Sequence, residues 1–277
     1  MAANIARAGI PLIVHNRTPG RAGLALESGA AEASTPREAA DGAEIVVTML
    51  TGGEALEETL FGPDGAATAD VTGKLFVDMS TTGPGVARRV AKRLGAHGAS
   101  FVDAPVSGTR EPAEKGELLV LAGGAREDLL RLERIFSCVG KRTLFAGPVG
   151  AGQTLKIVYN GLGCQHLVAF ASMLRLGERA GLSRDVLVDA FTSGAFATPA
   201  YVGKRARVLE RNYSDPDFVL ELVLRDAVLC AELQSALGFE LRTHAAARAE
   251  VARAVSVGLG GCDLFAIEHV YDEGSGA

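Results

Sequence analysis

The pattern of the chain changes near residue 150, and this change restricts the possible folds more than any other feature. Before that point, short runs rich in β-branched residues alternate with segments of helical pattern. Strands that alternate with helices predict a parallel, doubly wound sheet. After that point helical patterns dominate, and no segment is a convincing strand. The sequence therefore predicts an α/β domain over 1–149 and an all-helical domain over 150–277.

The individual elements follow from the same patterns. Proline at position 36, after Ser-Thr and shortly before Glu38, is a typical helix start. Strands are expected at 10–15, 44–50, 74–80, 100–105, 118–122 and 143–146, with a strand or turn at 30–33. Helices of the first half are expected at 1–8, 20–28, from 36, and at 54–60, 84–97 and 126–136. Helices of the second half are expected at 152–180, 183–193, 199–211, 218–237, 243–257 and near Leu264.

The predicted helix 152–180 is apolar on nearly all sides. A helix of this kind is surrounded by protein, either by its own domain or by a second subunit. One small helical domain offers too little cover for it. A homodimer or a homotetramer is therefore expected.

Composition excludes several classes of partner. The net charge is −5, the pI is near 5.6 and no basic block occurs, so nucleic acid is not an expected partner. The four cysteines are widely spaced among apolar residues, which is typical of reduced thiols in a cytoplasmic protein. No apolar run reaches membrane-spanning length, and no membrane partner is expected. The histidines lack metal-ligand spacing, so no metal is expected.

The front of the chain departs from the usual pattern. A nucleotide-binding sheet normally begins with a strand and a Gly-x-Gly-x-x-Gly turn at a helix N-terminus. Residues 1–9 contain neither. Either this is a different α/β domain, or the sequence begins after that unit. We expect the second, because the segments that normally follow such a turn are present.

An arginine follows the strand expected at 10–15, in the turn Asn16, Arg17 and Thr18. An acidic residue at this place accepts hydrogen bonds from a ribose hydroxyl, whereas an arginine suits a 2′-phosphate. A solvated turn with an incidental arginine is the alternative. The position after the strand favours NADP over NAD.

Two further strands end in polar segments, at 78–81 (Asp-Met-Ser-Thr) and at 103–108 (Asp-Ala-Pro-Val-Ser-Gly). Ligands of open α/β sheets bind at the carboxyl ends of strands. The first segment suits a nicotinamide ribose, or else only caps the helix at 84. The Ser107 hydroxyl and the following N–H groups suit a substrate carboxylate, or else form a plain turn. Asp103 is expected to brace this turn rather than to react.

Lys156 and Asn160 are four residues apart on the long apolar helix, so both project from one face. A helical lysine commonly extends its ammonium to solvent. The other interpretation is that burial lowers its pKa until it exchanges a proton with a substrate hydroxyl, which Asn160 aligns.

Four motifs stand in a fixed order: 16–18, 78–81, 103–108, and 150–153 (Gly-Ala-Gly-Gln) leading to Lys156 and Asn160. With them the sequence resembles the β-hydroxyacid dehydrogenase family, whose members include 3-hydroxyisobutyrate dehydrogenase and tartronate semialdehyde reductase. Phe218 with Arg225-Asp226 fits a further element of that family. The similarity runs from Met1 to about Asp226.

The resemblance implies a Rossmann-like domain, an all-helical domain and an NAD(P)-dependent reaction. It implies that Lys156 is the catalytic acid/base, and that hydride passes between nicotinamide and a small 3-hydroxy acid or its semialdehyde. The substrate set that it implies is Ser107, Gly108, Thr109 and Asn160. The cofactor set that it implies is Asn16, Arg17, Thr18, Met49, Leu50, Thr81 and Arg225.

The chain departs from the family at several positions. Residues 109–112 (Thr-Arg-Glu-Pro) replace glycines in a loop that borders the substrate, and Arg110 there is a candidate contact to an acid. Tyr159 replaces an asparagine, Thr51 a proline and Arg225 a lysine, which keeps charge but not geometry. Two alternatives stay open: a non-catalytic dimerising relative, and an imine or ketoacid reductase on the same fold.

Overall fold

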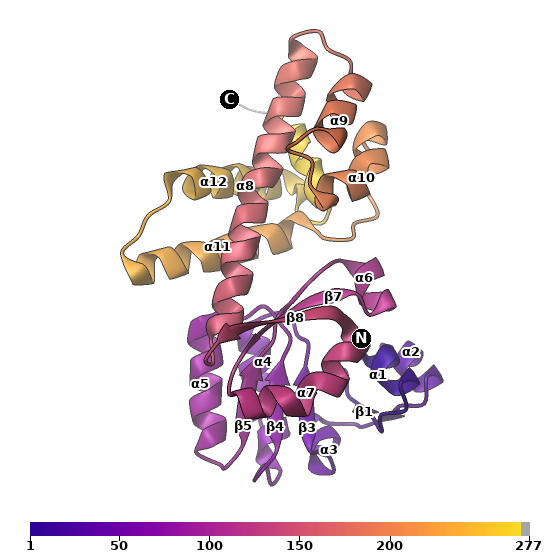
Figure 1. The fold of residues 1–277 in the computed structure, drawn as a ribbon, viewed down its shortest axis with the longest axis vertical. Helices are drawn as coiled ribbons and strands as arrows, with labels where there is room; N and C mark the ends of the chain where they lie inside the picture. The colour runs from indigo at the N-terminus through magenta and orange to yellow at the C-terminus, as the bar shows by residue number, and fades with distance from the viewer. Residues whose placement is uncertain (273–277) are drawn as a thin grey trace. The chain divides into compact units, whose positions relative to one another are not determined.

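The structure is a computed structural model that describes residues 1–272. The chain forms two compact units, Met1–Lys156 and Ile157–Ala277. The division falls inside one helix, α8 (Ala151–Arg179), which starts in the first unit and continues through the second (Figure 1). The domain boundary between 149 and 150 remains a prediction.

The first unit contains a six-stranded sheet. Its strands are β3 (Ile45–Thr48), β4 (Leu75–Asp78), β5 (Ser100–Asp103), β6 (Val106–Ser107), β7 (Leu118–Gly123) and β8 (Gly140–Gly147). The order is β3-β4-β5-β7-β6, and β8 also pairs with β7. Pairs β3–β4, β4–β5 and β7–β8 are parallel, whereas β7 runs antiparallel to β5 and β6. The predicted α/β class is confirmed, but the sheet is mixed rather than wholly parallel.

Two further strands form a separate parallel pair, β1 (Ile13–Val14) with β2 (Ala31–Glu32). Within residues 1–272 this pair has no strand pairing to the larger sheet, in which β3 is an edge strand. The first described element is helix α1 (Ala2–Arg7), as the sequence predicts.

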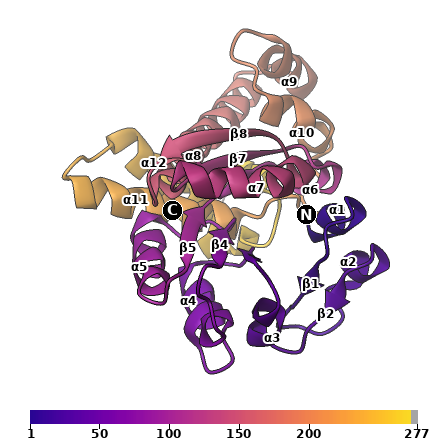
Figure 2. The ribbon, with the colours of Figure 1, turned by 60° about the horizontal axis from the view of Figure 1, so that its bottom comes forward.

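Alternate residues of the central strands pack on opposite faces of the larger sheet. Leu75 and Val77 pack with α7 (Arg126–Val139), while Phe76 and Phe101 pack with α4 (Gly53–Phe61) and α5 (Pro84–Gly95). Figure 2 shows α7 on one side of the sheet and α4 and α5 on the other. A sheet covered on both faces explains why these strands are continuous apolar runs.

The remaining helices of this unit are short: α2 (Gly23–Glu27), α3 (Pro36–Asp41), the 3₁₀ turn η1 (Ala66–Thr68) and α6 (Arg110–Lys115). Helix α3 begins as predicted, because Thr35 accepts a hydrogen bond from the Glu38 N–H and Glu38 accepts one from the Ser34 N–H. Helix α6 corrects a prediction, since residues 109–112 were expected to form a loop. Pro112 fits there because the first turn of a helix has no intrahelical use for its N–H.

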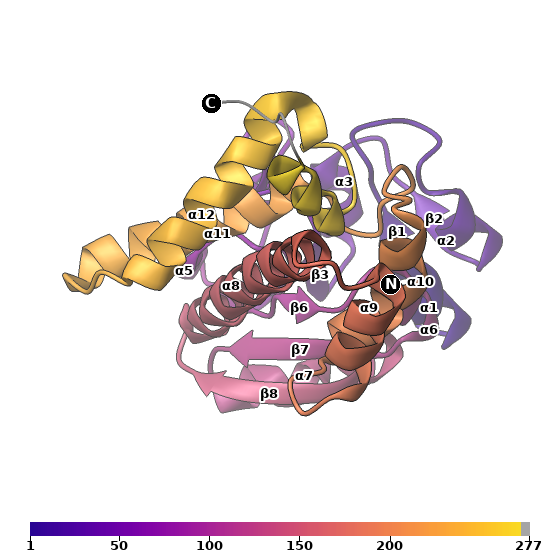
Figure 3. The same ribbon diagram turned by 90° about the horizontal axis from the view of Figure 1, so that it is seen from above.

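The second unit is helical, as predicted. Its elements are α8, α9 (Arg184–Ser193), α10 (Pro199–Glu210), α11 (Leu220–Leu237), α12 (Arg242–Ala254), a π-helical turn (Val255–Leu259) and η3 (Leu264–Tyr271). Figure 3 shows α9 and α10 on one side of α8, and α11 and α12 on the other. Apolar side chains of α8, among them Leu167, Phe170 and Leu174, form the core with these helices.

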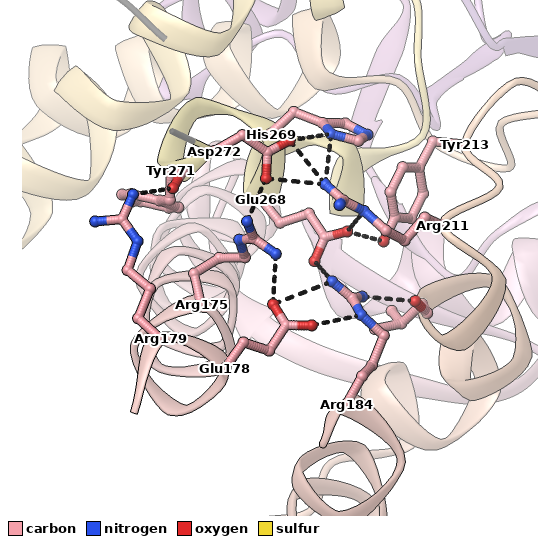
Figure 4. A network of polar contacts seen from close by, with 11 residues as sticks. Arg175, Glu178, Arg179, Arg184, Arg211, Tyr213, Glu268, His269, Tyr271 and Asp272 are labelled. Atoms are coloured by element: carbon pink, nitrogen blue, oxygen red, sulfur yellow. Dashed lines mark hydrogen bonds and ion pairs between the residues drawn. The ribbon is translucent and has the colours of Figure 1, made fainter. Parts of the chain in front are cut away.

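A network of charged side chains fastens η3 inside this unit (Figure 4). Glu268, 1% exposed, accepts hydrogen bonds from Arg184 (2.8 Å), Arg211 (2.9 Å) and the Tyr213 hydroxyl (2.9 Å). Arg184 also contacts Glu178 of α8 at 2.8 Å. Glu178, Arg184, Arg211 and Glu268 therefore each have a partner of opposite charge, which is the condition for burying them.

By length and composition, α8 is the one helix among residues 1–272 that could cross a membrane, and 39% of its most apolar window is buried in protein. The expectation that no apolar run reaches that length was too strict. Core helices of globular proteins pass the same test, because burial in protein also selects apolar residues.

Candidate functional site

Three polar residues form a row at the carboxyl edge of the larger sheet. Thr48, Asp78 and Asp103 end strands β3, β4 and β5, and they lie in register with one another. Both aspartates are 0% exposed. Buried carboxylates need hydrogen-bond partners, so these two residues organise the backbone around them.

Asp78 ties together the loops that follow β3 and β4. It accepts hydrogen bonds from the hydroxyls of Thr48 (2.9 Å), Ser80 (2.6 Å) and Thr82 (3.2 Å). The Ser80 hydroxyl in turn accepts one from the Leu50 N–H at 2.8 Å. Burial raises the pKa of Asp78, and the hydroxyl donors act in the opposite direction.

The predicted cofactor residues Met49, Leu50 and Thr81 lie in these two linked loops. Met49 is 57% exposed, while Leu50 and Thr81 are partly buried. The structure therefore brings two separate predicted segments together at the edge of the sheet where ligands of this architecture bind.

The predicted cofactor residues Asn16, Arg17 and Thr18 form an exposed turn after β1. The Asn16 amide donates to the Thr18 carbonyl at 2.8 Å, which closes the turn. The turn belongs to the two-stranded pair of β1 and β2. Its exposed guanidinium is accessible to a phosphate group.

The predicted substrate turn follows β6. Ser107 and Thr109 are partly buried, and Gly108 between them has a φ of +140°. A Cβ atom at Gly108 would lie 2.6 Å from Leu118 Cδ2. Only glycine fits this backbone, so the sharp turn that presents the two hydroxyls is built into the sequence.

Asp103 caps the start of α8. Its two carboxylate oxygens accept hydrogen bonds from the Gly150 N–H (2.6 Å) and the Gln153 N–H (2.7 Å). Burial raises the pKa of Asp103 to about 6, against the effect of these two bonds. The prediction placed Asp103 as a brace of its own turn, and the structure shows that it braces the helix that carries Lys156.

Gln153 completes the attachment and was not among the predicted site residues. Its side-chain oxygen accepts hydrogen bonds from Thr82 N (3.0 Å) and Gly83 N (3.1 Å), and its amide donates to the Ser80 carbonyl (2.8 Å). Gln153 is 0% exposed. In the sequence, a glutamine at the start of an apolar helix gives no signal of this role beyond its place in the motif.

Lys156 follows one turn later and is 9% exposed. A lysine that extended its ammonium to solvent would be far more exposed. The turn before it is fixed by Asp103 and Gln153, so the position of Lys156 is defined by the sheet edge itself.

In the second unit, Asp226 holds two predicted residues. Asp226 is 2% exposed and accepts hydrogen bonds from the Asn160 amide (2.6 Å) and the Arg225 guanidinium (2.8 Å). This contact orients the Asn160 side chain with its nitrogen toward the carboxylate. Asp226 was named only as part of a motif, and its role follows from α8 and α11 packing together.

A cavity of about 460 Å³ lies elsewhere in the first unit, between α7 and β8, and is lined by Leu130 and Phe145 among others. None of the predicted site residues lines it. No group of three metal-ligating side chains was found among residues 1–272.

Two family models match nearly the whole chain. Residues 1–147 match the NAD binding domain of 6-phosphogluconate dehydrogenase. Residues 150–271 match the model described as NAD-binding of NADP-dependent 3-hydroxyisobutyrate dehydrogenase.

Individual relatives agree over the full length. Glyoxylate/succinic semialdehyde reductase 1 of Arabidopsis thaliana is 30% identical over 267 residues, which are 96% of this chain and 92% of that protein. The crystal structure of 3-hydroxyisobutyrate dehydrogenase from Salmonella typhimurium has a TM-score of 0.88 and 28% identity, covering 97% of this chain and 94% of that chain.

The 3-hydroxyisobutyrate dehydrogenase of Mycobacterium tuberculosis, whose structure was determined with L-serine, has a TM-score of 0.87 and 26% identity, covering 97% of this chain and 93% of that chain. The resemblance and the fold class predicted from the sequence are confirmed by these matches. The chain belongs to the β-hydroxyacid dehydrogenase family of NAD(P)-dependent oxidoreductases.

Proposed function

We propose that this protein interconverts a small hydroxy acid and the corresponding aldehyde or keto acid, with Lys156 as the acid/base. The observation that carries the proposal is the placement of Lys156. It is 9% exposed and lies one turn beyond residues that Asp103 and Gln153 fasten to the carboxyl edge of the sheet. Fixed position and burial are what a general base requires.

The residues of the first unit fit a nicotinamide cofactor. The linked loops of Leu50 and Thr81 lie at the strand ends, and the exposed Arg17 turn follows β1. Arg17 supports NADP rather than NAD, because a guanidinium matches a phosphate with two parallel hydrogen bonds. When bound, the nicotinamide supplies the group that accepts or donates hydride.

The chain's own residues handle the proton and the orientation. In the oxidation direction, Lys156 takes the proton of the substrate hydroxyl as the C–H electrons leave with the hydride. In the reduction direction Lys156 returns that proton to the carbonyl oxygen. Asn160, oriented by Asp226, aligns the oxygen. Ser107, Gly108 and Thr109 hold the carboxylate through hydroxyl and backbone N–H groups.

The substrate class is a small carboxylic acid that carries an aldehyde, keto or hydroxyl group. Support comes from the relatives, whose names give glyoxylate, succinic semialdehyde and 3-hydroxyisobutyrate, and from the serine in the Mycobacterium tuberculosis structure. Thr109 and the helix α6 that follows it border the proposed turn, so they are the residues that select among such acids.

The test is NADPH oxidation followed with glyoxylate, succinic semialdehyde, small 3-oxo acids and a cyclic imine, with NADH in parallel. We expect turnover of at least one acid and a preference for NADPH. Lys156→Ala is expected to lower kcat by roughly 10²–10⁴-fold, the usual contribution of general acid–base catalysis. Lys92→Ala, at an exposed lysine of α5, is the matched control and leaves kcat unchanged.

Three outcomes would contradict the proposal. Unchanged turnover in Lys156→Ala removes the acid/base role. Turnover of the imine alone would support the alternative of an imine reductase on the same fold. No turnover with any substrate, together with no NADPH binding by calorimetry, supports a non-catalytic relative.

The proposal includes assembly and location. We propose a homodimer or homotetramer, supported by the apolar residues that α8 leaves exposed. We also propose a cytoplasmic location without a nucleic-acid or membrane partner. Its support is the acidic net charge of −5 and the four free cysteines, since reduced thiols persist in a reducing compartment.

A further inference from the structure

Strand β8 forms an open edge of the larger sheet. Within residues 1–272 it pairs with β7 alone, and Figure 3 shows it at the outer margin of the sheet, beside β7. Residues 141–143, 145 and 146 of this strand are exposed. Alternate residues of an edge strand direct their N–H and C=O groups away from the sheet, so β8 presents a row of backbone donors and acceptors to a further strand.

A groove lies along this edge, between β8 and α7. Its volume is about 460 Å³, within the range of roughly 300–1,000 Å³ that ligand pockets occupy. Thr143 and Phe145 of β8 line it. They stand beside Val120 and Ala122 of β7, and those two residues pack in the core with α7. Leu130 of α7 lines the groove as well, and it is 66% exposed, while Phe145 is 46% exposed. This β8 groove therefore presents apolar surface to solvent.

The lining of the β8 groove is basic, whereas the chain as a whole has a net charge of −5. Among the described residues, Arg126, Lys141 and Arg142 line it together with one carboxylate, that of Glu133. Arg126 lies over the ring of Phe145, with 5.3 Å between Arg126 Cζ and the ring centroid. None of the three basic side chains forms an ion pair with a carboxylate in the described part of the chain. Positive charge without a partner, next to apolar surface, is complementary to an anionic ligand that also carries apolar groups.

The open edge and the basic groove together select an extended acidic chain. A strand added to β8 forms backbone hydrogen bonds along the edge, and its alternate side chains point into the groove. A second copy of this chain is excluded as the occupant, because its own β8 carries the same Lys141 and Arg142, and like charges on edge strands repel. A small anion would use the charges but not the edge.

We propose that β8 and its groove bind an extended segment of a partner protein in which acidic residues flank apolar ones. The segment pairs with β8 as an additional strand. Its apolar side chains lie against Leu130 and Phe145, and its carboxylates approach Arg126, Lys141 and Arg142. None of the residues of the proposed catalytic site belongs to this surface, so the proposal does not depend on the proposed function.

The test measures binding of a fluorescein-labelled peptide, Asp-Thr-Leu-Asp-Leu-Thr-Asp, to the full-length chain by fluorescence anisotropy. The order of its side chains is the same in both directions, so it suits parallel and antiparallel pairing alike. In one matched peptide, lysine replaces each aspartate. In another, the central aspartate and the leucine after it are N-methylated, which removes a backbone donor on each side of the added strand. We expect each change to weaken binding by roughly 10-fold or more.

Variants of the chain test the surface itself. Arg142→Glu is expected to weaken binding of the aspartate peptide by roughly 10-fold and to strengthen binding of the lysine peptide, because the charge beside the edge is reversed. Leu130→Ser is expected to weaken both through the lost apolar contact. Lys92→Glu, at an exposed lysine of α5, changes the net charge as Arg142→Glu does and leaves both affinities unchanged. Circular dichroism verifies that each variant is folded.

Binding is measured without turnover, so the failure of this proposal and that of the proposed function are distinguishable. No binding of the aspartate peptide, or equal effects of Arg142→Glu and Lys92→Glu, would overturn the assignment of this surface. Equal binding of the N-methylated peptide would overturn strand addition, and displacement of both peptides by inorganic phosphate would then assign the basic residues to a small anion.

Discussion

At the scale of single residues, the carboxylates at the sheet edge contribute to this site by holding its backbone in place rather than by reacting. Asp103 contacts neither the substrate nor the nicotinamide in the proposed reaction. It accepts two backbone N–H bonds from the start of α8, and so it is a positioning residue for Lys156. Its burial and its hydrogen bonds have opposite effects on its ionisation.

The raised pKa of Asp103 makes the free energy of unfolding depend on pH. Burial raises the pKa of Asp103 from its ordinary value of 3.8 to about 6 in the folded protein. Between pH 4 and 6 the folded state holds a proton that the unfolded state releases, so the free energy of unfolding falls as pH rises through this window. Asp103→Asn has no such proton. We expect the stability of the variant relative to wild type to rise by up to about 3 kcal/mol over that range and to stay constant above it.

Urea titrations of both proteins from pH 4 to pH 8 measure this difference. Contributions of groups that do not interact with Asp103 are common to the two proteins and cancel, whereas the charge of Asp78 is one of the causes of the raised pKa of Asp103. A difference that does not change with pH would show that Asp103 titrates at the same pH in both states. The loss of one capping bond is expected to appear separately, as a constant offset at all pH values.

At the scale of elements, the attachment of α8 depends on a close approach of backbones. A Cβ atom on Gly152 would lie 2.3 Å from the Leu121 carbonyl oxygen and 2.6 Å from that of Asp103. Neither is the end of a flexible side chain, so the start of the helix must move. Gly152→Ala is expected to lower the free energy of unfolding by about 1–3 kcal/mol, the usual cost of overpacking.

Gly203, within α10, is the matched control, because a Cβ there meets nothing within 4 Å. Gly203→Ala removes chain entropy from the unfolded state and is expected to raise the free energy of unfolding by about 0.5–1 kcal/mol. Urea unfolding followed by circular dichroism compares the two. Equal changes in the free energy of unfolding for the two variants would show that the close approach of backbones at Gly152 does not exclude a side chain there.

At the scale of the whole molecule, the two units have separate cores and can be followed separately. The chain has no tryptophan, and its four tyrosines, Tyr159, Tyr201, Tyr213 and Tyr271, all lie in the second unit. Tyrosine fluorescence therefore reports the second unit alone, whereas circular dichroism reports both.

The network around Glu268 is the feature to test in this way. Glu268→Gln leaves Arg184 and Arg211 without their shared buried carboxylate. Removing one partner of a buried ion pair costs about 3–5 kcal/mol, so we expect the tyrosine transition to shift to lower urea. Glu232→Gln, at an exposed position of α11, is expected to change stability by less than about 0.5 kcal/mol. Coincident transitions for the two variants would contradict the role of the network.

Much of the fold could be predicted because it depends on local patterns. The six helices of the second half were placed within a few residues, since their apolar spacing and terminal residues are local signals. The two-residue strand β6, the antiparallel pairing of β7 and the short helix α6 were missed. These depend on pairing with distant strands, which outweighs weak local preference.

The sequence by itself determined the α/β-to-helical order, the family and the motifs around Lys156, because each is a pattern of neighbouring residues. Only the tertiary structure decided which residues hold that lysine in place. Asp103, Gln153 and Asp226 act across separations of 47 to 73 residues, and no local pattern specifies such a contact. The burial of Lys156 and the exposure of apolar side chains on α8 were decided in the same way, because exposure depends on what the rest of the chain covers.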